Sequence, residues 1–227
     1  MSLNDDDIIA EPLNKLFRIF DKYPQVRKIA ELNPKLNRSF WIPWFAGISR
    51  DLSTVYIDYR VPLKINVAGE GDLEHHFPCI KHETTEAGLM LLLNMDYTTA
   101  HHFANAREKE EVDKRGWNWD VYNRGIYPWI KVAEKRPPGK TIPPDLFIGT
   151  YREGGYKDYA LLEQMQLAKP NAMGKYPKEI AYVNYRKGSA KYNCGGCKYY
   201  QMISANKCAK VDGVISPSGV CNLWESS

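Results

Sequence analysis

The most strongly helical stretch of the sequence covers residues 81–112 and reads KHETTEAGLMLLLNMDYTTAHHFANAREKEEV. It contains no proline and a single glycine, and its apolar residues recur at the spacing of a buried helix face. The tripeptide Asn94-Met95-Asp96 interrupts this pattern near its middle. The pattern therefore predicts two helices that meet at residues 94–96.

Histidine and glutamate residues recur along this stretch. His82 and Glu86 are four residues apart and share a helix face, and a bend at residues 94–96 would bring His101 toward them. The string HETTE is similar to the HExxH motif of zinc peptidases, with Glu86 in place of the second histidine. One hypothesis is therefore a metal site of His82, Glu86 and His101 in which Glu83 activates water. The preferred alternative is a polar network that joins two helices, because His/Glu pairs are common on helices.

Two further segments favour helices. Residues 11–32 have apolar positions at helical spacing with an interruption at Pro24, which predicts two short helices rather than one long one. Residues 120–133 also fit a short helix, although they include a glycine and a proline.

Residues 39–61 have a different character. Two runs rich in β-branched and aromatic residues flank a charged, turn-like segment, which predicts a strand pair or hairpin. Trp41, Trp44 and Phe45 in the first run are expected to be core anchors. The predicted fold class is therefore α+β, with a mixed helical N-terminal domain that includes a short β-hairpin.

The composition is that of an ordinary globular protein, with 227 residues, 44% of them hydrophobic and 26% charged. A Pro- and Gly-containing region predicts a linker at residues 166–179 between a domain at 1–165 and a small irregular module at 180–227. The net charge of +4 is too small and too dispersed to indicate a nucleic-acid partner. The acidic start resembles no signal peptide, and no run is long enough for a membrane span, so we expect a cytoplasmic protein without a membrane partner.

Four of the five cysteines lie in the last 34 residues, with the spacing Cys194-x2-Cys197-x10-Cys208-x12-Cys221. Four thiolates at such spacing can hold a tetrahedral zinc ion or an iron–sulfur cluster. A zinc ribbon typically closes with a second CxxC, which this chain lacks. The fifth cysteine, Cys79, is expected to be a small buried hydrophobic residue rather than a nucleophile.

The residues around these cysteines resemble the cluster-binding half of the high-potential iron–sulfur protein family. The matching pattern is Val183-x-Tyr185, Cys194-x-x-Cys197 with Tyr199-Tyr200, Cys208-x-x-Val211-x-Gly213-x-Ile215-x-Pro217 and Gly219-x-Cys221-x-x-Trp224. The family usually has Gly-Trp-Cys at the fourth ligand, where this chain has Gly-Val-Cys. The resemblance implies one [4Fe-4S] cluster on the four cysteines, shielded by Tyr185, Tyr199 and Trp224, and an electron-transfer role with a redox partner.

A second resemblance concerns residues 40–150. The string TVYIDYRVP, the HETTE start, Tyr97-x-x-x-His101 and Glu108 are similar to a group of uncharacterised proteins encoded in bacteriophages and prophages. This resemblance implies a viral origin, a place in the host cytoplasm or in the virion, and phage structural proteins as partners. We therefore expect a virion structural or assembly component whose cluster stabilises a docking module. A one-electron carrier and a metal-dependent hydrolase are the two alternatives.

Overall fold

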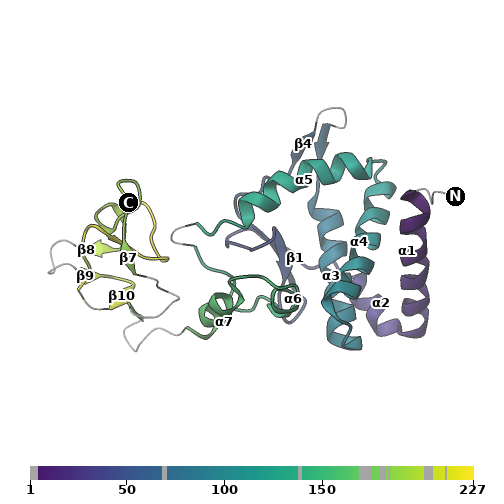
Figure 1. The fold of residues 1–227 in the computed structure, drawn as a ribbon, viewed down its shortest axis with the longest axis horizontal. Coiled ribbons are helices and arrows are strands. Elements are labelled where there is room, and N and C mark those ends of the chain that lie inside the picture. The colour runs from purple at the N-terminus through teal and green to yellow at the C-terminus, as the bar shows by residue number, and fades with distance from the viewer. Residues whose placement is uncertain are drawn as a thin grey trace. The chain divides into compact units, whose positions relative to one another are not determined.

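The computed structural model describes residues 5–67, 71–137, 140–168, 175–178, 183, 185–201, 207–212 and 214–227 (Figure 1). Its contacts divide the chain into two compact units. The first unit comprises Met1–Glu134 and Asp145–Tyr156, and the second comprises Lys135–Pro144 and Lys157–Ser227. The limits expected from the sequence, 1–165 and 180–227, stay predictions. Residues 169–174 and 179 of the expected linker lie outside the described residues.

The first unit is built mainly from helices. They are α1 (Asp5–Lys22), α2 (Pro24–Ala30), α3 (His76–Leu93), α4 (Tyr97–Lys114), α5 (Trp119–Ala133) and α6 (Gly149–Glu153). The predicted interruption at Pro24 is confirmed, because α1 ends at Lys22 and α2 begins at the proline, whose fixed φ and missing N–H suit the first position of a helix. Figure 1 shows α1, α3 and α4 side by side, and α4 contacts both of the others.

The turn between α3 and α4 explains the interruption in the helical pattern. Asn94 follows the last residue of α3 in a left-handed conformation, with φ 51° and ψ 36°, which asparagine tolerates better than most residues. Asp96 caps α4, and its side chain accepts a hydrogen bond from the backbone N–H of Thr99 at 3.0 Å. The prediction of two helices that meet at residues 94–96 is therefore confirmed.

A mixed three-stranded sheet packs against this helical layer. Its strands are β1 (Lys35–Asn37), β2 (Ala46–Ile48) and β3 (Thr54–Ile57), in the order β1-β3-β2. β2 and β3 are antiparallel, which confirms the predicted strand pair, and β1 runs parallel to β3. A separate antiparallel pair consists of β4 (Ile65–Val67) and β5 (Gly71–Leu73).

The aromatic segment that precedes β2 has an irregular backbone. Trp44 and Phe45 have positive φ angles of 59° and 93°, which a strand does not adopt. Trp41 and Phe45 are buried, as expected of core anchors. The core role expected of Trp44 holds only in part, because the turned backbone leaves its side chain partly exposed on the wall of a cavity.

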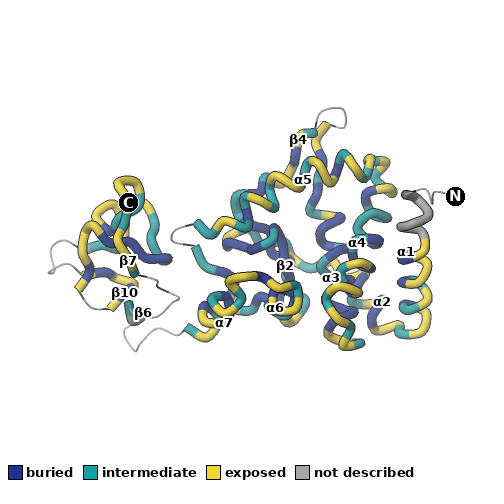
Figure 2. The backbone as a smooth tube through the Cα atoms, viewed as in Figure 1, coloured by how far each residue is buried: buried dark blue, intermediate teal, exposed yellow. Residues whose placement is uncertain are grey.

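Two apolar clusters hold the first unit together. Figure 2 shows the buried residues of this unit in dark blue, including those along α3 and β2. One joins the sheet to α3, α4 and α5 and includes Val55, Ile57, Ile80, Val112 and Ile126. The other joins α1, α2, α3 and α4 and includes Leu16, Phe20, Val26, Leu89 and Phe103. Helices therefore bury one face against other helices and another against a sheet, and the predicted α+β class is confirmed at this level.

The second unit contains α7 (Tyr159–Leu167) and a short 3-10 turn at Cys194–Gly196. Its two-residue strands are β6 (Tyr176–Pro177), β7 (Arg186–Lys187), β8 (Tyr200–Gln201), β9 (Lys207–Cys208), β10 (Val211–Asp212) and β11 (Gly219–Val220). They pair as β6 with β10, β7 with β11 and β8 with β9. Gly213 of the cysteine motif lies outside the described residues. Within the described part of the chain, no helix has the length and apolar character needed to cross a membrane.

Candidate functional site

The histidines and glutamates singled out in the sequence meet between α3 and α4. His82 and Glu86 lie one turn apart on α3, and His101 lies on α4. The ring centroids of His82 and His101 are 4.8 Å apart. Tyr97, one turn before His101 on α4, stacks on the ring of His101 with a centroid distance of 5.1 Å. The helical hairpin thus joins residues that the sequence separates by 15 positions or more.

One carboxylate oxygen of Glu86 bridges the two histidines. It accepts a hydrogen bond from Nδ1 of His101 at 2.7 Å and lies 3.5 Å from Nε2 of His82. One ligand atom from each of His82, Glu86 and His101 lies within 4.8 Å of the other two. Among the described residues, this is the group of three potential ligands that satisfies that distance. Two imidazoles and one carboxylate form a donor set typical of catalytic zinc.

Glu108 on α4 fixes the orientation of His82. Its Oε2 accepts a hydrogen bond from Nδ1 of His82 at 2.8 Å, and its Oε1 accepts one from the hydroxyl of Tyr122 on α5 at 2.7 Å. This hydrogen bond fixes the ring so that Nε2 of His82 faces Glu86 at 3.5 Å. Such a carboxylate behind a histidine is the usual way in which proteins orient a metal ligand.

The charges of these groups depend on one another. Burial lowers the pKa of His82, but the carboxylates of Glu108 and Glu86 outweigh it and hold that pKa well above its ordinary value. Burial raises the pKa of Glu86, but hydrogen bonds from His101 and His82 outweigh it and lower that pKa to about 2. Without a metal ion, the protonated ring of His82 therefore lies between the ionised carboxylates of Glu86 and Glu108. A divalent cation would displace that proton when it binds.

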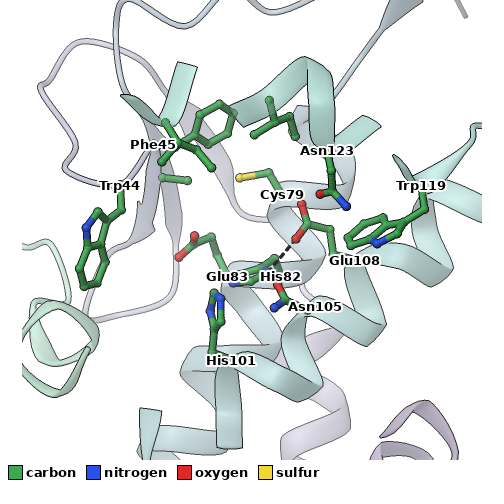
Figure 3. A pocket seen from close by; sticks show the side chains of 13 residues that line it. Trp44, Phe45, Cys79, His82, Glu83, His101, Asn105, Glu108, Trp119 and Asn123 are labelled. Carbon is green, nitrogen blue, oxygen red and sulfur yellow. Dashed lines mark hydrogen bonds and ion pairs between the residues drawn. The ribbon is translucent and has the colours of Figure 1, made fainter. Parts of the chain in front are cut away.

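Glu83 has no such partner. Its carboxylate faces the space between Trp44 and Phe45 (Figure 3), and no hydrogen bond or ion pair joins it to any residue that the structure describes. Burial raises the pKa of Glu83 to about 8; the nearby His82 opposes this rise, and Glu86 reinforces it. An unpaired carboxyl group beside a potential metal site is what a general acid or base requires.

A cavity of about 340 Å³ opens beside these groups. Its polar wall holds His82, Glu83, His101 and Glu108, and the remaining wall consists of Trp44, Phe45, Ala46, Cys79, Asn105, Trp119, Asn123, Ile126 and Ile130. A smaller adjoining space of about 70 Å³ shares Trp44, Ala46, His82, Glu83 and His101 with this cavity, and its remaining lining is Glu86, Tyr97, Thr150 and Tyr151. The candidate ligands therefore lie where the two spaces meet.

Sequence reasoning missed several residues of this wall. Asn105 follows His101 by four residues on α4, so helical spacing alone indicates that both lie on one face. Tyr122 and Trp119 carry no comparable signal, since they reach the site only because α5 packs against α4. Trp119 stacks on Tyr122 at a centroid distance of 5.6 Å. Cys79 is buried, and burial raises the pKa of its thiol well above the ordinary value, which agrees with the inert role expected of it.

The second unit gathers the other four cysteines. Cys194, Cys197, Cys208 and Cys221 are all free and buried. Burial raises the pKa of Cys194 to about 12, and the charges of the other three thiols add to the rise. Three of the four cysteines, Cys194, Cys208 and Cys221, lie in one apolar cluster. Within the described residues, however, no three of their sulfurs lie within 4.8 Å of one another.

An apolar shell surrounds these thiols. Three of the cysteines form a cluster with Val183, Val211, Ile215, Tyr185, Tyr199, Tyr200 and Leu223. The backbone N–H of Lys210 donates to Sγ of Cys208 at 3.4 Å. Trp224 makes a different contact, because its indole N–H donates to the carbonyl of Asn193 at 2.7 Å and its ring meets Tyr192 edge-on.

Comparison with known proteins assigns the chain to no group. No protein-family model, no curated protein and no solved structure matches it.

Proposed function

We propose that the first unit is a metal-dependent hydrolase whose metal ligands are His82, Glu86 and His101. The observation that carries this proposal is the mutual proximity of their three ligand atoms, within 4.8 Å, at the edge of a cavity of about 340 Å³. Two histidines and one carboxylate leave a coordination position open, as catalytic zinc sites require. A bound divalent ion would lower the pKa of a coordinated water and so supply a nucleophile near neutral pH.

Glu83 is the proposed general base. Its carboxyl group faces the cavity and has no hydrogen-bonding partner among the described residues. The positive charge of a bound divalent ion would oppose the effect of burial and favour the ionised form, which can take a proton from water. The water oxygen then bonds to the electrophilic carbon of the substrate, and Glu83 passes the proton to the leaving group as the old bond breaks. Neither step needs an oxidant or a further reactant.

Glu108 and Tyr122 are positioning residues in this proposal. The hydrogen bonds from Nδ1 of His82 and from the Tyr122 hydroxyl occupy both oxygens of Glu108, so this carboxylate is committed to orienting the histidine. The chain thus contains one carboxylate that is fully engaged and another, Glu83, that is not.

This arrangement favours a catalytic site over a purely structural network. Glu83 is partly buried. Removing a carboxylate from water without giving it a hydrogen-bonding partner costs free energy, and a network that only joined two helices would gain nothing from it. Glu83 has the same helix neighbours as His82 and Glu86, yet among the described residues it makes no hydrogen bond across to α4.

Titration of the full chain with Co²⁺ tests the metal site. Imidazole and carboxylate ligands give weak visible bands, whereas cysteine ligands add intense sulfur-to-cobalt absorption in the near ultraviolet. We expect one ion per chain to give the visible signal of imidazole and carboxylate ligands, separate from any thiolate signal of an ion at the four C-terminal cysteines. Binding of this ion should weaken about 100-fold in His101→Ala. The matched control is His102→Ala, which alters the adjacent, exposed residue on α4. Equal binding by the two variants would contradict the proposal.

A second function is favoured by the cysteines of the second unit. We propose that Cys194, Cys197, Cys208 and Cys221 hold one [4Fe-4S] cluster, with zinc as the alternative. Four buried cysteines that form no disulfide, three of which share one apolar cluster, support this proposal. Iron and acid-labile sulfide analysis of anaerobically purified protein tests it. About four irons and four sulfides per chain are expected for a cubane cluster. A colourless protein with one zinc per chain would overturn the iron–sulfur assignment.

A further inference from the structure

We infer that the cavity beside Glu83 takes an uncharged carboxamide that carries an aromatic group, and that it excludes phosphorylated compounds. The inference rests on the proposed hydrolase function and names its substrate class. The reaction would break the C–N bond of the amide and form a C–O bond to the water oxygen. The products are a carboxylic acid and an amine: one proton of the water moves through Glu83 to the amine nitrogen, and the other stays on the acid.

The charge of the lining is the first argument. Of the described residues that line the two adjoining spaces, none is lysine or arginine, whereas Glu83, Glu86 and Glu108 are all acidic. A divalent ion would offset only two of these three carboxylates when all are ionised. Sites for phosphate normally offer Arg, Lys or a row of backbone N–H groups. A phosphoryl group would therefore meet repulsion here, while a neutral amide would not.

Two free carboxamides provide the second argument. The side chains of Asn105 on α4 and Asn123 on α5 line the same cavity, and Figure 3 shows both beside Glu108. Neither amide makes a hydrogen bond to any other residue in the described part of the chain. A carboxamide offers both a donor and an acceptor, so it can pair with another amide through two complementary bonds. The polar recognition groups of this cavity therefore match an amide rather than a charged group.

The aromatic wall is the third argument. Trp119 is fixed by stacking on Tyr122, and Trp44 is held by Tyr151 at a centroid distance of 5.3 Å. Two preorganised indoles on the wall of a cavity provide flat apolar surfaces for a ring. A volume of about 340 Å³ lies at the lower end of ligand-binding pockets, which suits one ring and its amide.

Equilibrium binding of two small probes to the full chain tests the inference. N-benzoylglycinamide carries a ring and an uncharged amide, and phenyl phosphate carries the same ring and an anionic group. Calorimetric titration is done with metal-free and with Zn²⁺-loaded protein. We expect one N-benzoylglycinamide per chain in both forms, and binding of phenyl phosphate at least about tenfold weaker. Phenyl phosphate binding as tightly, or no binding of N-benzoylglycinamide, would overturn the inference.

Variants of Asn105 sharpen the test. Asn105→Leu keeps a side chain of similar size but removes both hydrogen-bonding groups, so binding of N-benzoylglycinamide should weaken about tenfold. Asn66→Leu is the control, because Asn66 is an exposed amide on β4 that does not line the cavity. An unchanged affinity in Asn105→Leu would refute the role given to this residue. If the native chain binds N-benzoylglycinamide but no Co²⁺ at His82, Glu86 and His101, the metal proposal alone is refuted.

Discussion

Replacing Glu108 by glutamine isolates the effect of one carboxylate on the proposed metal site. The native side chain accepts hydrogen bonds from Nδ1 of His82 at 2.8 Å and from the hydroxyl of Tyr122 at 2.7 Å. Glutamine has the same shape but only one accepting oxygen. In Glu108→Gln, one of these two buried donors must therefore face an NH₂ group.

The size of the effect follows from this lost acceptor. A buried donor without a partner costs about 1–3 kcal/mol. Loss of such a supporting carboxylate typically lowers metal affinity about 10–100-fold, or about 1.4–2.8 kcal/mol. The Glu108→Gln variant should therefore bind Co²⁺ at the His82 site about 10–100-fold more weakly than the native chain. Its free energy of unfolding should fall by about 1–3 kcal/mol because the same donor is buried.

Two assays on the same protein separate these outcomes. Cobalt binding is followed by visible absorption, and stability is measured by urea unfolding of the metal-free chain. Glu111→Gln is the matched control, because Glu111 lies three residues after Glu108 on α4 and forms an ion pair with Arg115 rather than a contact with His82. Native cobalt affinity in a folded Glu108→Gln variant would refute the reasoning that this carboxylate orients a metal ligand.

Three other predictions concern the stability of the first unit. His75 is fully buried and donates to the carbonyl of Pro62 at 2.7 Å; burial lowers its pKa from 6.5 to about 4. The unfolded chain therefore binds the proton more readily between these values. Stability should fall by up to about 3 kcal/mol as the pH drops from 6.5 to 4, and His75→Gln should remove that part of the pH dependence in urea unfolding. Leu89→Ala should cost about 2–5 kcal/mol in the same assay, because Leu89 is fully buried between α3 and its neighbours. Asn94→Val should lower the melting temperature while Asn94→Gly should not, because the position has a φ of 51°; equal effects of the two changes would contradict this.

The local chemistry of the chain could be predicted from the sequence because each signal depends on neighbouring residues. Pro24 predicts the start of a helix, and the interruption at residues 94–96 predicts a helical hairpin. The four-residue step from His82 to Glu86 places both on one face of α3. Likewise, the cysteine spacing predicts a cluster of thiols. The expected viral role and partners stay predictions from the sequence.

The composition of the site depended on the tertiary structure. His82 meets Glu108 across 26 residues, and Tyr122 completes that contact from a third helix. Helical periodicity states which residues share a face, but the register between two helices is set by how their apolar side chains pack. Trp44 reaches the cavity through a positive φ that strand alternation does not anticipate. Patterns in the sequence therefore indicated α1 to α5, the pair of β2 and β3, and the chemical groups that these elements carry. Only the packing of α3, α4 and α5 decided that Glu108 is engaged and that Glu83 faces an open space.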